Sequence, residues 1–181
     1  NRPLAPVDTA QAATENVANA VQWLIVPRHP QRFDEVARLC IEAGFSVSRR
    51  SQWTDGPRQA DIWIGDTLGE MALYFGLSHV ALLGGSFAPL GGQNLIEAAA
   101  CGCPVVMGPH TFNFAQAAEL AQAAGAAFEV ADMAQAVARA RRLVASPSEL
   151  AQAAHAALAL SQAHRGAAER TARAVKTLLL G

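Results

Sequence analysis

Short apolar runs alternate with segments of helical character along this chain. Each run is bounded by glycine, proline or polar residues and is too short for a helix, so the runs predict strands buried on both faces. These strands are expected at residues 23–26, 45–48, 61–67, 80–83, 105–107 and 127–130. The spacing of the runs leaves room for a helix between most successive strands.

The segments between the strands predict helices. In residues 31–43, Phe33, Val36 and Cys40 recur at helical spacing on one face, and Gly44 follows where glycine commonly ends a helix. Further helices are expected at about residues 8–22, 68–75, 93–101, 113–124, 132–145 and 146–180. Strands that alternate with helices over short connections predict an α/β fold. It would have a mainly parallel sheet flanked by helices and a long helical segment at the C-terminus.

Length and composition narrow the range of functions. The 181 residues fit one domain, and a hydrophobic content of 51% allows a sizeable core. A net charge of −1 without a long run of one sign argues against a nucleic-acid partner. No apolar stretch approaches the roughly 18 residues of a membrane span. The three cysteines include the close pair Cys101 and Cys103, but no further Cys/His pair has the spacing of zinc ligands, which favours reduced thiols over a zinc site. The first residue is not Met, which indicates a processed or excised piece.

The clearest chemical signal lies in residues 80–112. There a predicted strand ends at Gly84–Ser86, a second glycine pair follows at Gly91–Gly92, and a helix begins near Asn94. Backbone amides at glycine turns and at a helix N-terminus can hold a phosphate group. The spacing is neither that of a dinucleotide-binding glycine motif nor that of a P-loop. The pattern therefore predicts a phosphate site without naming the ligand.

Three loops that follow predicted strands should lie at one edge of the sheet, because ligands of parallel sheets collect at the carboxyl ends of strands. These loops are Pro27–Pro30, Gly84–Ser86 and Met107–His110. Arg49 and Arg50 follow another strand, and we interpret them as a solvated pair rather than as part of the site, although an acidic ligand could recruit one of them.

Four polar residues beside these loops are candidates for binding. Arg28 suits a phosphate or carboxylate, with a plain surface charge as its alternative. His29 is either an anion contact or a histidine that merely ends a strand. Glu97 could accept hydrogen bonds from adjacent sugar hydroxyls or match the helix dipole. Asn94 caps the helix and is also a candidate to contact the ligand.

Four sequence motifs occur in order over about residues 23–145. They are V-P-R-H-P-x-R-F from Val26, G-D-T-L-G-E-M from Gly65, G-G-S-x-x-P-L-G-G-x-N from Gly84 and V-V-M-G-P-H-T-F-N-F from Val105. Together they resemble the C-terminal half of bacterial 3-deoxy-D-manno-octulosonic acid (Kdo) transferases of lipopolysaccharide assembly. Members of that family have two facing Rossmann-like domains in the GT-B arrangement, and the C-terminal one binds CMP-Kdo.

The resemblance implies that residues 1–181 form a single Rossmann-like donor domain, one half of a GT-B fold. It places the CMP phosphate by Gly84, Gly85 and Ser86, with Arg28 as the charge partner. It also implies that Asn94 and Glu97 contact the ribose or the donor sugar, and that Met107, Gly108 and Pro109 border the cytosine. His29 is a further candidate contact with the donor.

The resemblance also implies what the complete enzyme does. It would transfer Kdo with inversion from CMP-Kdo to a lipid A precursor at the cytoplasmic face of the inner membrane. The catalytic glutamate base and the acceptor site would lie in an N-terminal domain absent from these residues. We therefore expect no catalytic residue, metal or cofactor here. The piece itself should be soluble, and it should bind donor without turning it over.

Some points stay open at the level of sequence. The strand and Gly-Glu turn expected before the first helix of the family's domain are not evident in residues 1–9. One alternative is a GT-B-type transferase or epimerase that uses a UDP-sugar. Another is a non-catalytic interaction domain in which the long C-terminal helix makes the contact.

Overall fold

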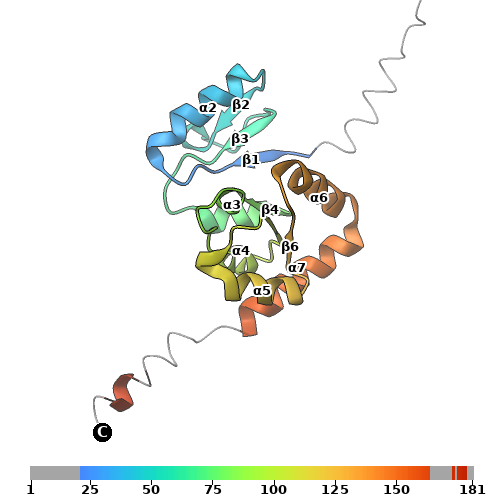
Figure 1. Cartoon of the computed structure of the whole chain (residues 1–181). Helices are drawn as coiled ribbons and strands as arrows, with labels where there is room; N and C mark the ends of the chain where they lie inside the picture. Colours follow the sequence, from blue (N-terminus) through green and yellow to red (C-terminus); the bar gives the residue numbers. More distant parts are fainter. Residues whose placement is uncertain (1–20, 164–172, 174, 179–181) are drawn as a thin grey trace, which may run out of the picture. The chain divides into compact units, whose positions relative to one another are not determined.

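The chain forms two compact units, Asn1–Leu68 (unit 1) and Gly69–Gly181 (unit 2), each with its own sheet (Figure 1). The computed structural model describes residues 21–163, 173 and 175–178. All the strand pairings among these residues are parallel, and helices flank the strands, which confirms the predicted fold class. The strands are shared between two three-stranded sheets where we expected one sheet, and the single-domain organisation stays a prediction.

The sheet of unit 1 has the strand order β1-β3-β2. Its strands are β1 (Trp23–Ile25), β2 (Val47–Arg49) and β3 (Ile62–Ile64). A short 3₁₀ helix, η1 (Pro30–Arg32), leads into helix α2 (Phe33–Glu42). These strands match the predicted positions to within a few residues, because short apolar runs form the strands of a sheet that is buried on both faces.

Side chains alternate between the two faces of the unit 1 sheet, as the pleat of a strand requires. Ile62 and Ile64 pack on α2 in one hydrophobic cluster. On the other face, the ring of Trp53 meets that of Trp63 edge-on, with 5.5 Å between centroids. The Trp53 indole also donates to the Ser48 hydroxyl at 2.9 Å. The loop after β2, which begins with the 3₁₀ helix η2 (Arg50–Gln52), therefore covers this second face.

Unit 2 holds the sheet β4-β5-β6. In chain order its elements are α3 (Met71–Leu77), β4 (Ala81–Leu83), η3 (Gly84–Ser86), α4 (Ile96–Ala100), β5 (Val105–Met107), η4 (Phe112–Phe114), α5 (Ala115–Ala123), β6 (Ala127–Glu129), α6 (Met133–Ala145) and α7 (Pro147–Ala163).

Helices cover both faces of the unit 2 sheet. Alanines of α4, α5 and α7 pack against Val105 and Met107 in the largest cluster, while Ala136 and Leu143 of α6 pack against Val106 on the other face. Helix α7 also packs on α4, α5 and α6 (Figure 1). The alanine-rich composition thus lets several helices approach one short sheet closely.

Several predicted helix ends are confirmed by the backbone. The carboxylate of Asp132 accepts a hydrogen bond from the Gln135 amide at 2.8 Å and caps α6. Gly44 follows α2 with a φ of 90°, in the left-handed region that favours glycine. Such local signals can be read from sequence because they need no distant partner.

Other predicted helix ends are wrong. Gly76 lies inside α3 rather than after it, because burial of Tyr74 and Phe75 outweighs the roughly 1 kcal/mol that glycine costs within a helix. Asn113 lies in η4 and does not cap α5; its side-chain amide donates to the Leu90 carbonyl at 3.3 Å. Val21 and Gln22 are not helical, and the rest of the predicted helix at 8–22 lies outside the described residues. Residues 173 and 175–178 are helical, as predicted.

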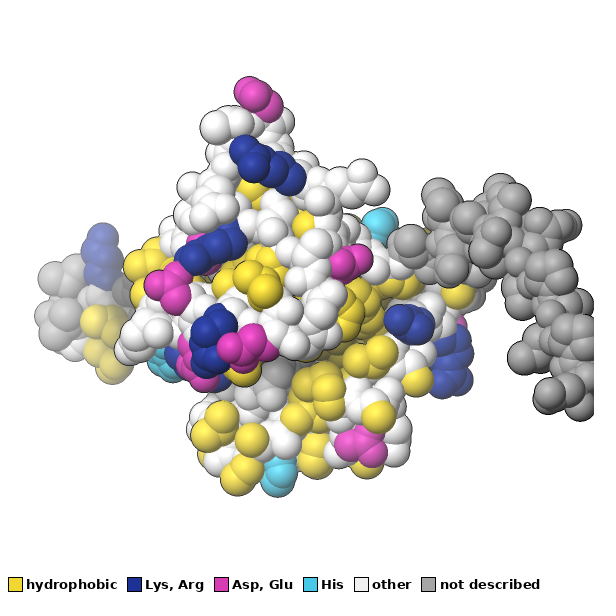
Figure 2. Space-filling view, turned by 90° about the horizontal axis from the view of Figure 1, so that it is seen from above, with side chains coloured by type: hydrophobic (Ala, Val, Ile, Leu, Met, Phe, Trp, Pro, Cys, Tyr) yellow, Lys and Arg dark blue, Asp and Glu magenta, His cyan; other side chains and the backbone are white. Residues whose placement is uncertain are grey.

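Charged side chains of both signs are interspersed on the face shown in Figure 2, consistent with 14 basic and 15 acidic residues. Within the described ranges, no helix combines the length and the apolarity that crossing a membrane requires.

Candidate functional site

A buried serine hydroxyl joins the carboxyl ends of β4 and β5. Ser86 is 0% exposed, and its Oγ donates to the Leu83 carbonyl at 2.5 Å and accepts from the Gly108 amide at 2.7 Å. The Ser86 carbonyl in turn accepts from the His110 amide at 3.0 Å. Because the one hydroxyl proton is already used, Ser86 builds the predicted phosphate loop rather than donating its hydroxyl to a ligand.

The backbone of Gly108 packs so closely against the glycine loop that there is no room for a Cβ atom at this position. A Cβ at this position would lie 2.5 Å from the Ser86 carbonyl oxygen and 2.7 Å from Cδ1 of Phe87. Its amide is occupied by Ser86, so Gly108 serves the site by close packing and not as a free donor. Gly108, which the resemblance places beside the cytosine, therefore makes a structural contact between two loops.

The second glycine pair lies against the loop after β5. Gly91 and Gly92 have φ values of 86° and 79°, which other residues rarely adopt. The Gly91 carbonyl accepts from the Asn113 amide at 3.2 Å, and a Cβ on Gly91 would collide with the Asn113 side chain. This pair therefore holds the long loop between β4 and α4 in place.

The backbone amides of Gly84 and Gly85 are the amides of the glycine loop that are best placed to bind an anion. Gly84 and Gly85 are the first two residues of η3, and the first amides of a 3₁₀ helix have no acceptor within it. A Cβ on Gly84 would meet nothing within 4 Å. Beside Gly85 lies the side chain of Gln93, whose Cγ and Cδ would be 3.7 Å from such a Cβ. Sequence reasoning missed Gln93, although it stands between the glycine pair and Asn94.

Asn94 and Glu97 are both exposed at the start of α4. Asn94 Oδ1 accepts from the Ile96 amide at 3.1 Å in the turn before the helix. The N-cap of α4 is Leu95, so the prediction that Asn94 caps this helix is wrong. Nδ2 of Asn94 donates to Glu97 Oε1 at 3.1 Å and so orients a carboxylate that remains accessible to a sugar hydroxyl. In contrast, Met107 is 0% exposed within the core, so its side chain does not border a ligand, whereas Pro109 is exposed.

The loop after β1 in unit 1 carries Arg28 and His29, and both are exposed. Among the described residues, Arg28 has no ion-pair partner, which leaves its guanidinium available for a ligand. Arg28 belongs to unit 1 and the glycine loop to unit 2, so their common contact with one phosphate stays a prediction.

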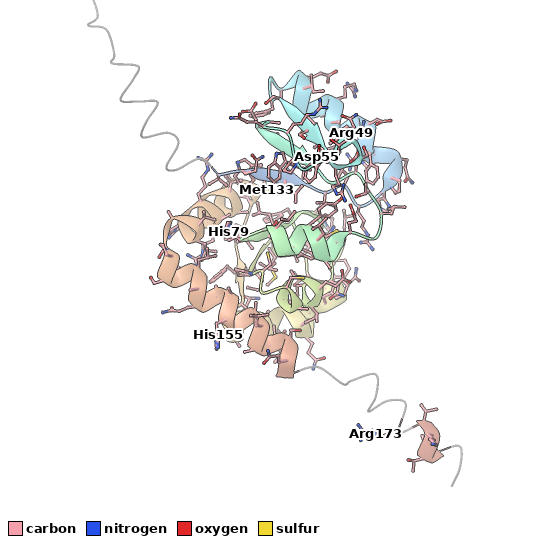
Figure 3. The ribbon with its side chains drawn as sticks, turned by 180° about the vertical axis from the view of Figure 1, so that it is seen from behind. Arg49, Asp55, His79, Met133, His155 and Arg173 are labelled. Carbon is pink, nitrogen blue, oxygen red and sulfur yellow. The ribbon has the colours of Figure 1, made fainter. Side chains whose placement is uncertain are left out.

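The interpretation of Arg49 and Arg50 as a solvated pair is wrong. Arg49 lies in unit 1 (Figure 3). Its Nε donates to Asp66 at 2.6 Å, and its Nη1 donates at 2.7 Å to Asp34 in the first turn of α2. The guanidinium of Arg50 lies over the Trp53 ring, 5.6 Å from its centroid. The carboxyl ends of β2 and β3 place Arg49 and Asp66 side by side, a contact between neighbouring strands that only the pairing order reveals.

Asp66 is the buried anchor of this edge. Its side chain is 1% exposed and also accepts from the amide and hydroxyl of Ser51, at 2.8 and 2.6 Å. Burial alone would raise the pKa of Asp66, but the hydrogen bonds from Ser51 and Arg49 outweigh burial and lower it. The carboxylate therefore stays charged at neutral pH and holds the loop after β2.

Of the three cysteines, Cys40 and Cys103 are buried. Burial, with a smaller contribution from the neighbouring Cys101, raises the pKa of the Cys103 thiol to about 12. No group of three or more His, Cys, Asp or Glu residues is placed to hold a metal ion in the part of the chain that the structure describes. The expectation of neither metal nor cofactor stays a prediction.

Parallel sheets flanked by helices, with a glycine loop at a strand end, define a Rossmann-like half of a GT-B fold. The fold is similar to the crystal structure of the C-terminal CMP-Kdo binding domain of WaaA from Acinetobacter baumannii. The TM-score is 0.74 at 31% identity, over 85% of this chain and 80% of that one.

The sequence is similar to curated relatives over 86% of its length. It is 50% identical to the 3-deoxy-D-manno-octulosonic acid transferase of Bordetella pertussis and 34% identical to that of Haemophilus influenzae, in each case over 157 residues. The chain spans only 37% of the length of either relative. No protein-family profile matches the chain. The chain belongs to the Kdo transferase family, in which it corresponds to the C-terminal domain.

We predict that Gly108→Ala lowers the free energy of unfolding by about 1–3 kcal/mol, because the new methyl group overlaps the Ser86 carbonyl. Gly84→Ala is the matched control, since its methyl group meets nothing within 4 Å. Urea unfolding followed by circular dichroism measures both variants. Equal midpoints for the two variants would contradict the close packing described for Gly108.

We predict that Asp66→Asn costs about 1–3 kcal/mol at pH 7, because it leaves donors of Ser51 and Arg49 without their charged acceptor. The lowered pKa sets the sign of the pH dependence. The stabilisation is complete above the ordinary Asp pKa of about 3.9 and is lost as the pH falls through the lower folded value.

The measurement is urea unfolding of wild type and Asp66→Asn between pH 7 and pH 2.5. Asp55→Asn, at an exposed aspartate of the same unit, is the control for the loss of one charge (Figure 3). The gap between wild type and Asp66→Asn should narrow as the pH falls below about 4. A gap that is constant over the whole range would show that the charge of Asp66 contributes nothing.

Proposed function

We propose that this chain is the donor-binding part of a glycosyltransferase that moves Kdo from CMP-Kdo to a lipid A precursor. The observation that carries the proposal is the similarity to a domain whose structure is described as CMP-Kdo binding, at 31% identity over 80% of that chain. The open glycine loop after β4 supports it, because that loop presents amides to an anion at the strand ends where such folds bind ligands.

The contacts divide according to chemistry. The amides of Gly84 and Gly85 receive the phosphate of CMP, and Arg28 neutralises its charge. Glu97, oriented by Asn94, accepts hydrogen bonds from hydroxyls of the ribose or of the sugar. The backbone and ring of Pro109 border the cytosine, next to the tightly packed Gly108.

In this proposal the chain contributes electrostatic stabilisation to the reaction. The acceptor hydroxyl loses its proton to a general base outside this chain and attacks the anomeric carbon of Kdo, while the bond to the CMP phosphate breaks with inversion. Negative charge grows on the departing phosphate, and fixed amides with an arginine stabilise it. The chain alone therefore binds CMP-Kdo or CMP and transfers nothing, and the lipid acceptor contacts the remainder of the enzyme at the inner membrane.

We predict that Arg28→Ala weakens CMP binding roughly 10- to 100-fold, the loss expected for one charged hydrogen bond of about 1.5–3 kcal/mol. Isothermal titration calorimetry with CMP measures the affinity. Arg38→Ala is the control, because Arg38 is an exposed arginine of the same unit whose partner is Glu42 at 2.6 Å. It removes the same charge from a different place.

Three results would count against the proposal in different ways. Equal affinity of wild type and Arg28→Ala for CMP would remove Arg28 from the site. Tighter binding of UMP than of CMP would instead favour a UDP-sugar enzyme, and the absence of binding to any nucleotide would favour an interaction domain.

A further inference from the structure

Arg49 is held by two carboxylates in very different surroundings. On one side its Nε donates to Asp66, whose side chain is 1% exposed. On the other side its Nη1 donates to Asp34, whose side chain is 87% exposed. The Arg49 side chain itself is 26% exposed, so its outer part can be reached from solvent. The Nε side of the guanidinium is therefore fixed by buried Asp66, and the Nη1 side pairs with solvent-exposed Asp34.

The two contacts differ in how easily they can be exchanged. Asp66 is locked by Ser51 as well as by Arg49, and breaking this buried contact would leave several polar groups unpaired. The pair with Asp34 is an exposed ion pair, and such pairs contribute only about 0–1 kcal/mol. A competing oxyanion could replace Asp34 on Nη1 at little cost, while Asp66 keeps the guanidinium in place.

The exchangeable contact lies where a parallel sheet binds ligands. Arg49 ends β2, and Arg28 follows β1, so both stand at the carboxyl edge of the unit 1 sheet. Asp34 comes from the first turn of α2, which begins at the same edge. Two arginines at one edge suit a donor that carries two separate anionic groups, a phosphate and a sugar-acid carboxylate.

We propose that Nη1 of Arg49 binds an oxyanion of the donor, which displaces Asp34 from the guanidinium. The inference rests on the proposed function, since it takes CMP-Kdo as the ligand. The oxyanion is either the Kdo carboxylate or the CMP phosphate, and both match the fork of donors on arginine. Asp34 occupies the position in the free protein and keeps the arginine paired until the donor arrives.

Substitution of Asp34 tests this idea without disturbing the anchor, whereas replacement of Arg49 would leave the buried Asp66 without its charged partner. Asp34→Asn keeps the shape and removes the competing charge. Glu42→Gln is the matched control, because Glu42 is on the same helix, is exposed and pairs with Arg38. Both variants change the net charge by one, so a general gain in attraction for anions cancels in the comparison.

The full chain is titrated separately with CMP and with Kdo by calorimetry. Asp34→Asn should bind one of the two roughly two- to fivefold more tightly than Glu42→Gln does, the factor that matches a competing surface ion pair. Tighter binding of Kdo identifies the carboxylate, and tighter binding of CMP identifies the phosphate. A purely structural ion pair gives no gain in affinity for either probe.

Two outcomes would overturn the inference and can be told apart. If wild type binds CMP but Asp34→Asn and Glu42→Gln show equal affinities for both probes, the exchange at Arg49 is refuted and the proposed function stands. If neither probe binds to wild type or to Asp34→Asn, the proposed function fails together with this inference.

Discussion

The hydroxyl of Ser86 connects the two strand ends on which the candidate site of unit 2 is built. It donates to the carbonyl of Leu83 and accepts from the amide of Gly108, so both of these buried backbone groups have a hydrogen-bond partner. This bridge brings the loop after β5 so close that only glycine fits at position 108. The position of the open amides of Gly84 and Gly85 therefore depends on one neutral hydrogen-bonded contact behind them.

In unit 1, a buried charged group fixes the corresponding loop. At its sheet edge, buried Asp66 receives hydrogen bonds from Ser51 and Arg49 and fixes the loop after β2. Burial of the carboxylate is tolerated because each contact favours its charged form. In both units a buried polar group fixes a loop, and exposed residues on that loop or beside it remain available for a ligand. A rigid support of this kind reduces the entropy lost when a small anion binds.

The sequence predicted the parallel α/β character because apolar runs and glycine punctuation are local signals. Gly44 and Asp132 were placed correctly for the same reason, since each acts on its own helix end. The role of Arg49 could not be predicted, because it depends on the pairing of β2 with β3 and on a helix turn that precedes both. Likewise, the neighbouring residues in the sequence do not show that the Ser86 hydroxyl is buried and bonded to Gly108, which is 22 residues away.

The most direct test of the account follows the backbone amides of Gly84 and Gly85 by heteronuclear NMR during titration with CMP and, separately, with cytidine. We expect CMP to shift these two amide signals of unit 2 more than those of Gly44 and Gly56, which lie in loops of unit 1. Cytidine, which lacks the phosphate, should leave them nearly unmoved. Equal shifts with both ligands, or shifts confined to residues away from the glycine loop, would contradict a phosphate site at these amides.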